Sequence, residues 1–492
     1  MTFEPFIAGW GGWSVLYLII DIAIRIVAVI VVPRNRKPTA GTAWLMLIFI
    51  QPAVGMLIFL LIGNPKLPRK RRLIQEEINA TVKEGVELLP KQELQPGAPK
   101  WFDSLVELNG NLGALPLLGG NTATLNGDYN NTLEQMSREI DTATEYVHIE
   151  FYIMSSSEIT AEFFDAIGHA TARGVKVRVL FDHIASLRSP RYKQTKKRLR
   201  EVGAEWHMML PVQPLRGKYQ RPDLRNHRKL MIVDGRVGYM GSQNLVDRTY
   251  LKRSNLKRGL KWKDLMVRVV GPTVDALNVI FLSDWYAETG EIIALRLDMA
   301  EAVPEGTPDV LDCQVVPSGP GFDGENNLRL FLGLLYAAEE RIVITSPYFV
   351  PDEALMYAVT TAVQRGVPVD LFVSEEGDQA VVFHAQRSYY EELLRAGVRI
   401  FMYPAPYILH SKHFTIDDDV AVIGSSNMDM RSFGLNLEVS LLVRGESFVR
   451  DMRAIEDEYR AVSRELTLDE WERQPLRSTI LDNLARLTSA LQ

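Results

Sequence analysis

The chain contains the same polar pattern twice, with identical spacing. The pattern is H-x-K-x4-D-x6-G-S-x-N-x3-R, and the two copies start 183 residues apart. One match could arise by chance, but two equal copies over 22 positions predict two similar structural units whose polar residues act together. The first copy is His227, Lys229, Asp234, Gly241, Ser242, Asn244 and Arg248, and the second is His410, Lys412, Asp417, Gly424, Ser425, Asn427 and Arg431.

Each copy brings an imidazole and an ammonium group together. Residues two apart on a strand point to the same face, so His227 lies beside Lys229 and His410 beside Lys412. Such a pair suits phosphodiester transfer in two steps, because one histidine can attack phosphorus while the other protonates the leaving group. We expect neither a metal nor a cofactor, since the lysines supply positive charge. Further donors for the transition-state oxygens are the amides of Asn244 and Asn427.

Carboxylates near the two copies take different roles. Asp234 and Asp417 are counted with the histidines and lysines in the predicted catalytic set, but they stand at predicted hairpin turns, and we expect them mainly to organise these turns. Asp264 and Glu438 lie in later strand-like stretches. Each can accept a hydrogen bond from an imidazole and fix its tautomer, or form an ordinary salt bridge instead.

Two long apolar runs precede the repeated pattern. They are the 20-residue segment Trp13–Val32 and the uncharged 23-residue segment Gly41–Gly63. Each is long enough to cross a hydrocarbon core about 30 Å thick, so we expect a two-helix transmembrane hairpin. Asp21 and Arg25 should pair along the first helix, because a lone charge in the bilayer is costly. Gln51-Pro52 predicts a kink in the second.

Other arrangements of this region stay open. Two buried core helices or a shallow re-entrant hairpin would show similar composition. A cleaved signal peptide is disfavoured, because the residues before the first run include Glu4 but no Lys or Arg. With two spans, the N-terminus and the remaining chain share one side. Five positive charges in Lys66–Arg72 against three in Pro33–Ala40 place that side in the cytoplasm, by a narrow margin.

The remaining chain is acidic. Residues 1–72 hold nine Lys or Arg and two acidic residues, a balance of +7 within a net charge of −6, which leaves −13 for residues 73–492. General nucleic-acid binding requires a basic surface. We therefore expect no nucleic acid as a partner.

Strands and helices alternate in two similar stretches, which predicts α/β lobes with parallel or mixed sheets. In the first, strand Tyr146–Met154 precedes a helix over residues 159–173 and a strand after Gly174. In the second, strand Arg341–Val350 precedes a helix over residues 353–365 and a strand after Gly366. Glycine follows both predicted helix ends. The expected parts are residues 1–72 (hairpin and basic flank), 73–120 (connector), 121–300 (first lobe), 301–465 (second lobe) and 466–492 (amphipathic tail).

Basic residues surround the first copy of the pattern. Arg216–Arg225 precedes it, and six Lys or Arg lie within residues 252–263, in an insertion that the second lobe lacks. Both a membrane-facing loop and a solvated loop fit these charges. The tail has helical spacing on one face, which predicts packing on the lobes or on the membrane surface. Its apolar residues are Leu476, Ile480, Leu481, Leu484, Leu487 and Leu491.

Longer blocks of sequence are similar to a known family. The blocks NHRKLMIVDGRVGYMGSQN, SPYFVPDEAL, RSYYEELLRAGVRIF and HSKHFTIDDDVAVIGSSNMDMRSFGLNLEV resemble the phospholipase D superfamily and, within it, the bacterial cardiolipin synthases. With the two apolar runs and the tail, the resemblance covers nearly the whole chain. The first copy reads Gly-Ser-Gln-Asn where many relatives have Gly-Gly-x-Asn, and Asn244 stays in place.

The resemblance implies two lobes packed face to face about a pseudo-twofold axis, with both copies in one site. It implies a cardiolipin synthase that moves a phosphatidyl group from one phosphatidylglycerol to another through a phosphatidyl-histidine, releasing glycerol. By similarity His227 is the nucleophile and His410 the acid and base, although the symmetric copies do not distinguish them. A bacterial inner membrane is the implied location. Phosphatidylethanolamine is an alternative donor, and no oligomeric state is predicted.

Other activities use similar residues. A phospholipase D hydrolase would differ only in taking water as the acceptor. A nuclease of the same superfamily is disfavoured by the acidic charge and the apolar runs. A membrane scaffold without activity is disfavoured because both copies keep histidine and lysine.

Overall fold

The computed structural model describes residues 12–34, 36, 38–63, 67–86, 94–113, 115–213, 220–294, 303, 307, 309–322 and 324–489. The chain forms two compact units. The N-terminal unit consists of residues 1–66 with 221–223, and the body consists of residues 67–220 and 224–492. Part of the basic stretch predicted before His227, residues 216–219, lies outside the described residues.

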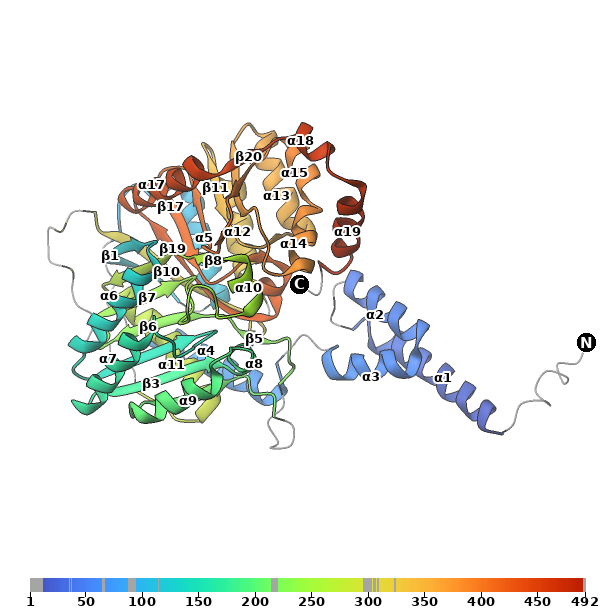
Figure 1. The fold of residues 1–492 in the computed structure, drawn as a ribbon, viewed down its shortest axis with the longest axis horizontal. Coiled ribbons are helices and arrows are strands. Elements are labelled where there is room, and N and C mark those ends of the chain that lie inside the picture. The colour runs from blue at the N-terminus through green and yellow to red at the C-terminus, as the bar shows by residue number, and fades with distance from the viewer. Residues whose placement is uncertain are drawn as a thin grey trace, which may run out of the picture. The chain divides into compact units, whose positions relative to one another are not determined.

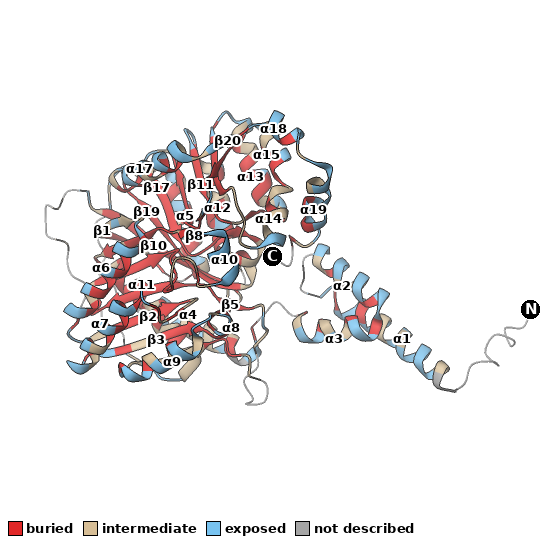
Figure 2. Ribbon diagram, in the orientation of Figure 1, coloured by how far each residue is buried: buried red, intermediate tan, exposed pale blue. Residues whose placement is uncertain are grey.

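The first apolar run forms one long helix, α1 (Gly12–Val31). Its segment Ser14–Val31 has a mean hydropathy of 2.5 and only 6% of its residues are buried, so it is long and apolar enough to cross a membrane. Arg25 Nε lies 3.0 Å from Asp21 Oδ2, which confirms the predicted pair. Figure 2 shows α1 as mostly exposed or half-buried.

The second apolar run is two helices, α2 (Pro38–Ile50) and α3 (Pro52–Ile62). The chain reverses at Gln51, so that Trp44 of α2 and Phe59 of α3 come together with their ring centres 5.4 Å apart. A Cβ on Gly55 would lie 2.7 Å from the Ile48 Cα, so only glycine permits this close approach. The predicted kink is therefore a complete break. At 1.5 Å per residue the helices are about 20 and 17 Å long, each shorter than a hydrocarbon core of about 30 Å.

The body is built on one 16-stranded mixed sheet with helices on both faces (Figure 1). Antiparallel strands β1 and β10 meet at its middle. Outward from β1 the first lobe has β1 (Leu117–Asn126), β9 (Met266–Val270), β7 (Val237–Gly241), β6 (Lys229–Val233), β2 (Tyr146–Phe151), β3 (Lys176–Asp182) and β4 (Glu205–Met209). Outward from β10 the second lobe has β10 (Leu311–Ser318), β19 (Asn436–Arg444), β17 (Val420–Gly424), β16 (His413–Ile416), β11 (Ile342–Thr345), β13 (Val369–Ser374), β14 (Arg399–Tyr403) and β20 (Arg464–Leu466).

The two lobes repeat one strand pattern. In each, the motif hairpin (β6–β7 or β16–β17) is antiparallel, and the first strand of the predicted α/β stretch runs parallel to the next (β2–β3 or β11–β13). The predicted strand–helix–strand order is confirmed in both lobes, with α7 (Ala161–Ala172) and α13 (Glu353–Gln364) as the helices. Short strands complete the body: β5 (Arg225–Asn226) beside β19, β8 (Lys261–Lys263) beside β15 (Tyr407–Leu409), and β12 (Phe349–Val350) beside β18 (Met428–Asp429).

The helices pack against the sheet through apolar faces. α11 (Thr273–Thr289) contacts strands β2, β6, β7 and β9, and one buried core combines its Phe281 and Trp285 with Val439 and Phe448 of the second lobe. Strands β6 and β16 are buried at every residue, as expected of strands covered on both faces. The lobes therefore share a core. The other helices are α4 (Arg69–Val86), α5 (Lys100–Gly113), α6 (Tyr129–Thr142), α8 (His183–Leu187), α9 (Tyr192–Glu201), α10 (Arg253–Arg258), α12 (Asn326–Ala337), α14 (Ala380–Arg387), α15 (Tyr390–Ala396), α16 (Met430–Gly434), α17 (Glu446–Val462), α18 (Leu468–Glu472) and α19 (Leu476–Arg486).

Candidate active site

Both motif histidines lie where the two lobes exchange backbone hydrogen bonds. His227 stands between β5 and β6, and its N–H donates to the Leu437 carbonyl of the second lobe at 2.8 Å. His410 stands between β15 and β16, and its N–H donates to the Lys263 carbonyl of the first lobe at 2.7 Å. Each histidine backbone is thus fixed by the lobe to which it does not belong.

Each imidazole also pairs with a carboxylate of the opposite lobe. His227 Nδ1 lies 2.9 and 3.0 Å from the two oxygens of Glu438 and 3.1 Å from the Ser425 carbonyl. His410 Nδ1 lies 2.7 Å from Asp264 Oδ1. With Nδ1 donating to a carboxylate, Nε2 keeps its lone pair for bond formation or proton transfer. The structure therefore places Asp264 and Glu438 beside imidazoles, in crossed pairs.

The Gly-Ser step of each copy supports the carboxylate of its own lobe. Ser242 Oγ donates to Asp264 Oδ1 at 2.7 Å, and Ser425 Oγ donates to Glu438 Oε2. A Cβ on Gly241 would lie 2.4 Å from the Leu265 carbonyl oxygen, so glycine lets the two strands approach. Each site half is thus a serine–carboxylate–histidine chain that crosses from one lobe to the other.

The two lysines are buried beside the histidines. Lys229 and Lys412 are 0% and 3% exposed, and each Nζ donates to the carbonyl of its own motif histidine, His227 or His410. Lys229 also lies 5.4 Å from the centre of the Tyr152 ring. Two buried ammonium groups within one site attract an anion strongly, because little solvent screens them.

Burial and the two lysine charges govern the imidazole pKa values. Burial, Lys229 and Lys412 lower the pKa of His227 well below its ordinary value. Burial and Lys412 lower the pKa of His410 to about 4, with Asp264 opposing. Burial also lowers the pKa of Lys229 well below its ordinary value and that of Lys412 to about 8. An anion bound among these groups would raise all four pKa values.

The two carboxylates differ in their electrostatic environment. Burial raises the pKa of Glu438 to about 7, although Lys229 and Ser425 oppose it. Burial also acts on Asp264, but His410 and Lys412 outweigh it and lower the pKa of Asp264 below its ordinary value. Asp264 therefore stays ionised at neutral pH, whereas Glu438 titrates near it.

The two asparagines are buried next to the motif strands. Asn244 Nδ2 donates to the Tyr250 hydroxyl at 2.8 Å, and its Oδ1 accepts from the Ile153 N–H at 3.1 Å. Asn427 is 5% exposed, and its Oδ1 has no hydrogen-bond partner among the described residues. The amide of Asn244 is thus occupied by protein groups at both Nδ2 and Oδ1, while Asn427 Oδ1 is an acceptor without a partner and only the Asn427 Nδ2 could donate to a phosphoryl oxygen.

Asp234 and Asp417 lie at the hairpin turns and not beside the imidazoles. Asp234 has φ 51°, and its carboxylate accepts from the N–H groups of Thr144, Glu145 and Tyr146 at 2.8–2.9 Å. Asp417 has φ 45° and accepts in the same way from residues 339–341. Seven residues of extended chain put about 23 Å between His227 and Asp234. The motif aspartates therefore join each hairpin to the start of the neighbouring strand, the turn role predicted for them, and the structure does not place them with the reacting groups.

Replacing Asp234 by alanine should lower stability and not chemistry. Asp234→Ala leaves three backbone N–H groups without their charged acceptor, so we expect a loss of about 3 kcal/mol in unfolding free energy and a clear fall in melting temperature. Turnover per folded molecule should stay near wild type. Asp418→Ala is the matched control, because that side chain is 63% exposed. Lost turnover with unchanged melting would instead give Asp234 a part in the reaction.

Sequence reasoning assigned no role to several residues of the site. The Tyr152 and His227 rings lie 4.7 Å apart, edge to face, and Arg431 contributes to the electrostatics of both. The Tyr348 hydroxyl donates to Asp378 at 2.7 Å, and the charge of Asp378 acts on Lys412. Tyr152 lies within the predicted strand Tyr146–Met154, directly after β2, and Tyr348 lies in the SPYF block. Both tyrosines follow the first strand of a predicted strand–helix–strand stretch, and this shared position was the one sequence signal that could have indicated them.

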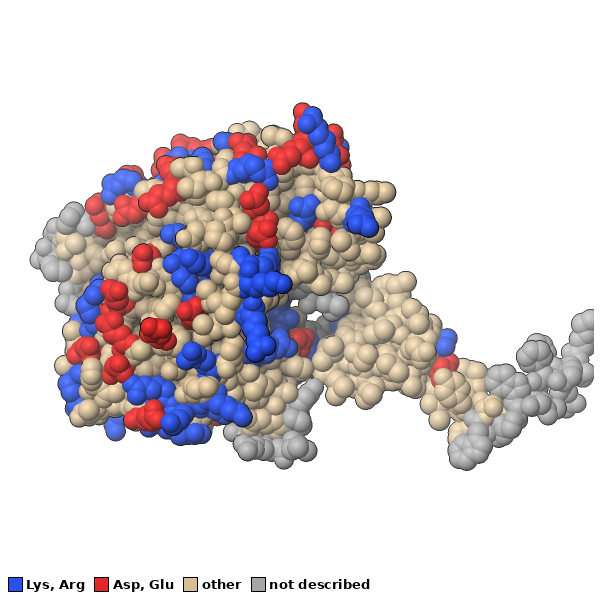
Figure 3. Space-filling view, in the orientation of Figure 1, with Lys and Arg blue, Asp and Glu red and all other residues tan. Residues whose placement is uncertain are grey.

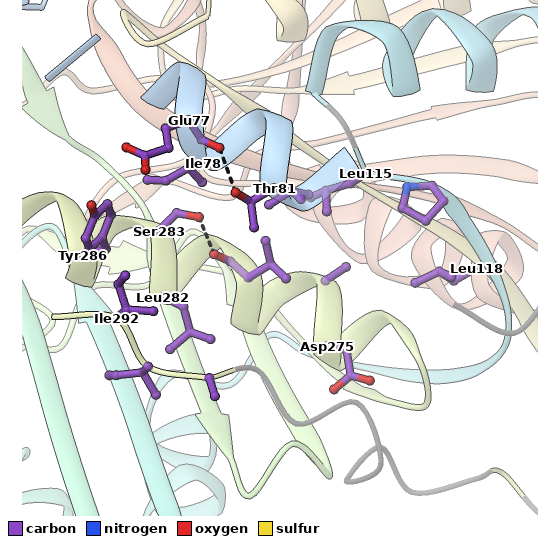
Figure 4. A pocket seen from close by; sticks show the side chains of 16 residues that line it. Glu77, Ile78, Thr81, Leu115, Leu118, Asp275, Leu282, Ser283, Tyr286 and Ile292 are labelled. Carbon is purple, nitrogen blue, oxygen red and sulfur yellow. Dashed lines mark hydrogen bonds between the residues drawn. The ribbon is translucent and has the colours of Figure 1, made fainter. Parts of the chain in front are cut away.

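The body also holds an apolar pocket of about 430 Å³ between α4, β1 and α11 (Figure 4). Two of its three hydroxyl groups are occupied by their own helices, since Thr81 donates to the Glu77 carbonyl at 3.0 Å and Ser283 to that of Val279 at 2.7 Å. None of the motif residues lines this pocket. It is therefore distinct from the candidate active site.

Paired His-Lys motifs on a duplicated α/β sheet define a phospholipase D-like phosphatidyltransferase, and comparison with known proteins narrows the class. A family model described as "Cardiolipin synthase, PLD-like domain" matches residues 136–285 and 331–459, more than half of the chain. Cardiolipin synthase A of Proteus mirabilis (strain HI4320) is 33% identical over 462 residues, covering 93% of this chain and 94% of that protein. Cardiolipin synthase A of Yersinia pseudotuberculosis serotype IB (strain PB1/+) is 32% identical, covering 100% and 99%. The chain belongs to the cardiolipin synthase family.

A solved structure supports the fold. The crystal structure of phosphatidylserine synthase from Haemophilus influenzae Rd KW20 aligns with a TM-score of 0.56 at 15% sequence identity. The alignment covers 79% of this chain and 100% of that one. The predicted α/β fold with two phospholipase D-type repeats is confirmed.

Proposed function

We propose that this enzyme transfers a phosphatidyl group from one phosphatidylglycerol to the hydroxyl of another, giving cardiolipin and glycerol. The observation that carries the proposal is the pair of crossed histidine–carboxylate contacts with two buried lysines between the lobes. This arrangement offers one imidazole to attack phosphorus and a second to move protons. Phosphatidylethanolamine as one of the two lipids remains an alternative.

The asymmetry of the two pairs supports His227 as the nucleophile and His410 as the acid and base. Asp264 is ionised at neutral pH and stabilises an imidazolium at His410, whereas burial raises the pKa of Glu438 towards neutrality. Burial, Lys229 and Lys412 also lower the pKa of His227 well below its ordinary value. A bound phosphate raises the pKa of both imidazoles, and the ionised Asp264 beside His410 favours the proton there, so that His227 keeps a lone pair on Nε2.

The reaction then balances in two steps. In the first, His227 Nε2 bonds to phosphorus, the phosphorus–oxygen bond to glycerol breaks, and His410 gives its proton to that oxygen. In the second, His410 takes the proton of a hydroxyl on the second lipid, whose oxygen bonds to phosphorus as the bond to His227 breaks. Lys229, Lys412 and the Asn427 amide hold the non-bridging oxygens in both transition states.

The two predicted lobes and their pseudo-twofold arrangement belong to the same proposal. The strand order outward from β1 matches that outward from β10, and each lobe contributes one histidine and the carboxylate of the other. These features support an axis between β1 and β10. Neither lobe by itself would contain a complete acid–base pair.

The experiment that tests the function uses purified full-length protein in vesicles with phosphatidylglycerol as the only lipid substrate. Cardiolipin and glycerol in equal amounts would establish transfer between lipids. Phosphatidic acid without cardiolipin would make water the acceptor and the enzyme a hydrolase. No product in this assay, with turnover of a nucleic-acid phosphodiester, would support a nuclease instead.

We also propose that the N-terminal unit anchors the enzyme in the cell membrane with the body in the cytoplasm, and that its second arm is re-entrant. Arg36, before α2, donates to the carbonyl of Gly63, after α3, so both ends of this arm lie together. A re-entrant arm puts the three positive charges of residues 33–40 and the five of residues 66–72 on one side. Two full spans would divide them, against the positive-inside rule.

Cysteine labelling separates the re-entrant arm from the two-span hairpin predicted from the sequence. In a Cys313→Ala background, Thr2→Cys should react with an impermeant maleimide added outside the inner membrane, and Asn35→Cys should not. The two-span hairpin predicts the reverse. Lys197→Cys, on exposed α9, is the control and should stay protected. Labelling at Lys197→Cys would place the body outside.

A further inference from the structure

The C-terminal helix α19 turns its apolar face away from the body. Its large apolar side chains are between 50% and 81% exposed, although they fall on one side of the helix. The predicted helical tail is confirmed, but its leucines do not pack on the lobes. The exposed residues are Leu476, Ile480, Leu481, Leu484 and Leu487, and Leu491 lies outside the described residues.

Polar contacts hold α19 in this orientation. Asp482 is 2% exposed, and its carboxylate lies 2.6 Å from His384 Nδ1 and 3.3 Å from Arg387 Nε, both on α14. Arg387 also donates to Ser478 Oγ at 3.1 Å. A surface helix normally buries its apolar stripe and exposes its charges, so this reversed arrangement indicates that the stripe has another apolar environment.

We propose that α19 lies in the plane of the membrane surface, with its apolar side in the lipid. Interfacial helices combine such a stripe with cationic side chains, and here Arg477 and Arg486 are exposed on the same helix. A second copy of the chain is a weaker occupant. Eleven residues form a helix about 16 Å long. The area of one face of so short a helix is far smaller than the roughly 800 Å² per partner that a stable dimer buries.

One chain segment links α19 to α10 and to the charges of the candidate active site. Residues 376–379 lead into α14, the helix that holds α19, and Asp378 among them acts on Lys412. On the other side of this segment, Arg258 of α10 donates to the Gly377 carbonyl at 3.0 Å. The docking surface therefore includes α10 of the first lobe, residues 376–379, and α14 with α19 of the second lobe.

The α10 end of this surface has the charge that an anionic membrane attracts. Leu256 is 54% exposed, and the exposed side chains of Lys252, Arg253 and Lys257 surround it. Figure 3 shows Lys and Arg side chains gathered over α10 and the adjoining part of the first lobe. This is the insertion that the sequence marks as basic. Anionic lipid headgroups fit such a patch, and an apolar residue at its tip fits the headgroup boundary.

A depth measurement tests the inference without requiring turnover. We would attach an environment-sensitive fluorophore to Leu484→Cys or Leu487→Cys in full-length Cys313→Ala protein, reconstituted in vesicles containing phosphatidylglycerol. Lipids with a quencher on the acyl chain should reduce the signal at both positions at least about twofold. Asp451→Cys, on α17 with its side chain 65% exposed, is the matched control and should show no quenching.

Either of two other results would overturn the inference. A label on α19 that a water-soluble quencher reaches as easily as at position 451 would place the helix in solvent. A label shielded from both quenchers would mean that protein covers the stripe. A functional variant adds a second readout: Ile480→Glu with Leu484→Glu should lower transfer in vesicles about tenfold and leave turnover of dissolved short-chain phosphatidylglycerol unchanged. Loss of both activities in this variant would instead indicate damage to the site. If the wild-type protein gives no transfer from phosphatidylglycerol, the proposed function is wrong, but the depth measurement still tests the position of α19.

Discussion

His410→Ala should trap the phosphatidyl-enzyme when the leaving group needs no proton, and His227→Ala should not. With phosphatidylglycerol both variants should lose at least about 10⁴-fold in turnover, because nucleophile and general acid are each required. A phosphatidyl ester of p-nitrophenol removes the need for the acid. His410→Ala should then release about one nitrophenol per enzyme and stop, because no base activates the acceptor hydroxyl.

The measurement is the size of this burst together with the mass of the protein after an alkaline quench. His169→Ala is the control, since that side chain is 66% exposed and lies outside the site, and it should turn over continuously. A burst from His227→Ala with none from His410→Ala would exchange the two roles. Bursts from both would mean that either histidine can act as the nucleophile.

The sequence predicted the fold well where periodicity and repetition carry the information. Strands β2, β3, β11 and β13 and the helices between them stand where alternating apolar runs and glycine stops predict them. The second apolar run shows the limit. Composition alone indicated one span with a kink at Gln51-Pro52, but contacts such as Trp44 with Phe59 depend on a chain reversal that composition does not encode.

The sequence indicated most of the residues that the structure brings together in the candidate site, but not how they pair. Equal spacing selected His227 and His410, and position selected Asp264 and Glu438. Nothing local shows that each carboxylate serves the histidine of the other lobe, because that contact depends on how the two lobes pack. The role of Tyr152 was not predictable either, since it rests on a ring contact with His227 made in the folded chain.

Breaking either crossed pair should lower turnover about 10²- to 10⁴-fold, because the imidazole loses the partner that fixes its tautomer and stabilises its charge. Asp264→Asn should impair proton transfer in both steps. Glu438→Gln should impair the attack by His227. With the p-nitrophenol ester, Asp264→Asn should keep a fast burst followed by slow turnover, whereas Glu438→Gln should slow the burst itself. The stopped-flow burst rate therefore distinguishes the two carboxylates.

The pH dependence of kcat/KM should assign the acidic limb to Glu438. Burial raises its pKa to about 7, so it becomes protonated as the pH falls through that value and no longer accepts from His227. Activity should fall on this side, and Glu438→Gln should abolish the limb while Asp264→Asn keeps it. Ser425 opposes the pKa rise, so Ser425→Ala should move the limb to higher pH. A limb near pH 7 that persists unchanged in Glu438→Gln would assign it to another group and remove the electrostatic reason for choosing His227 as the nucleophile.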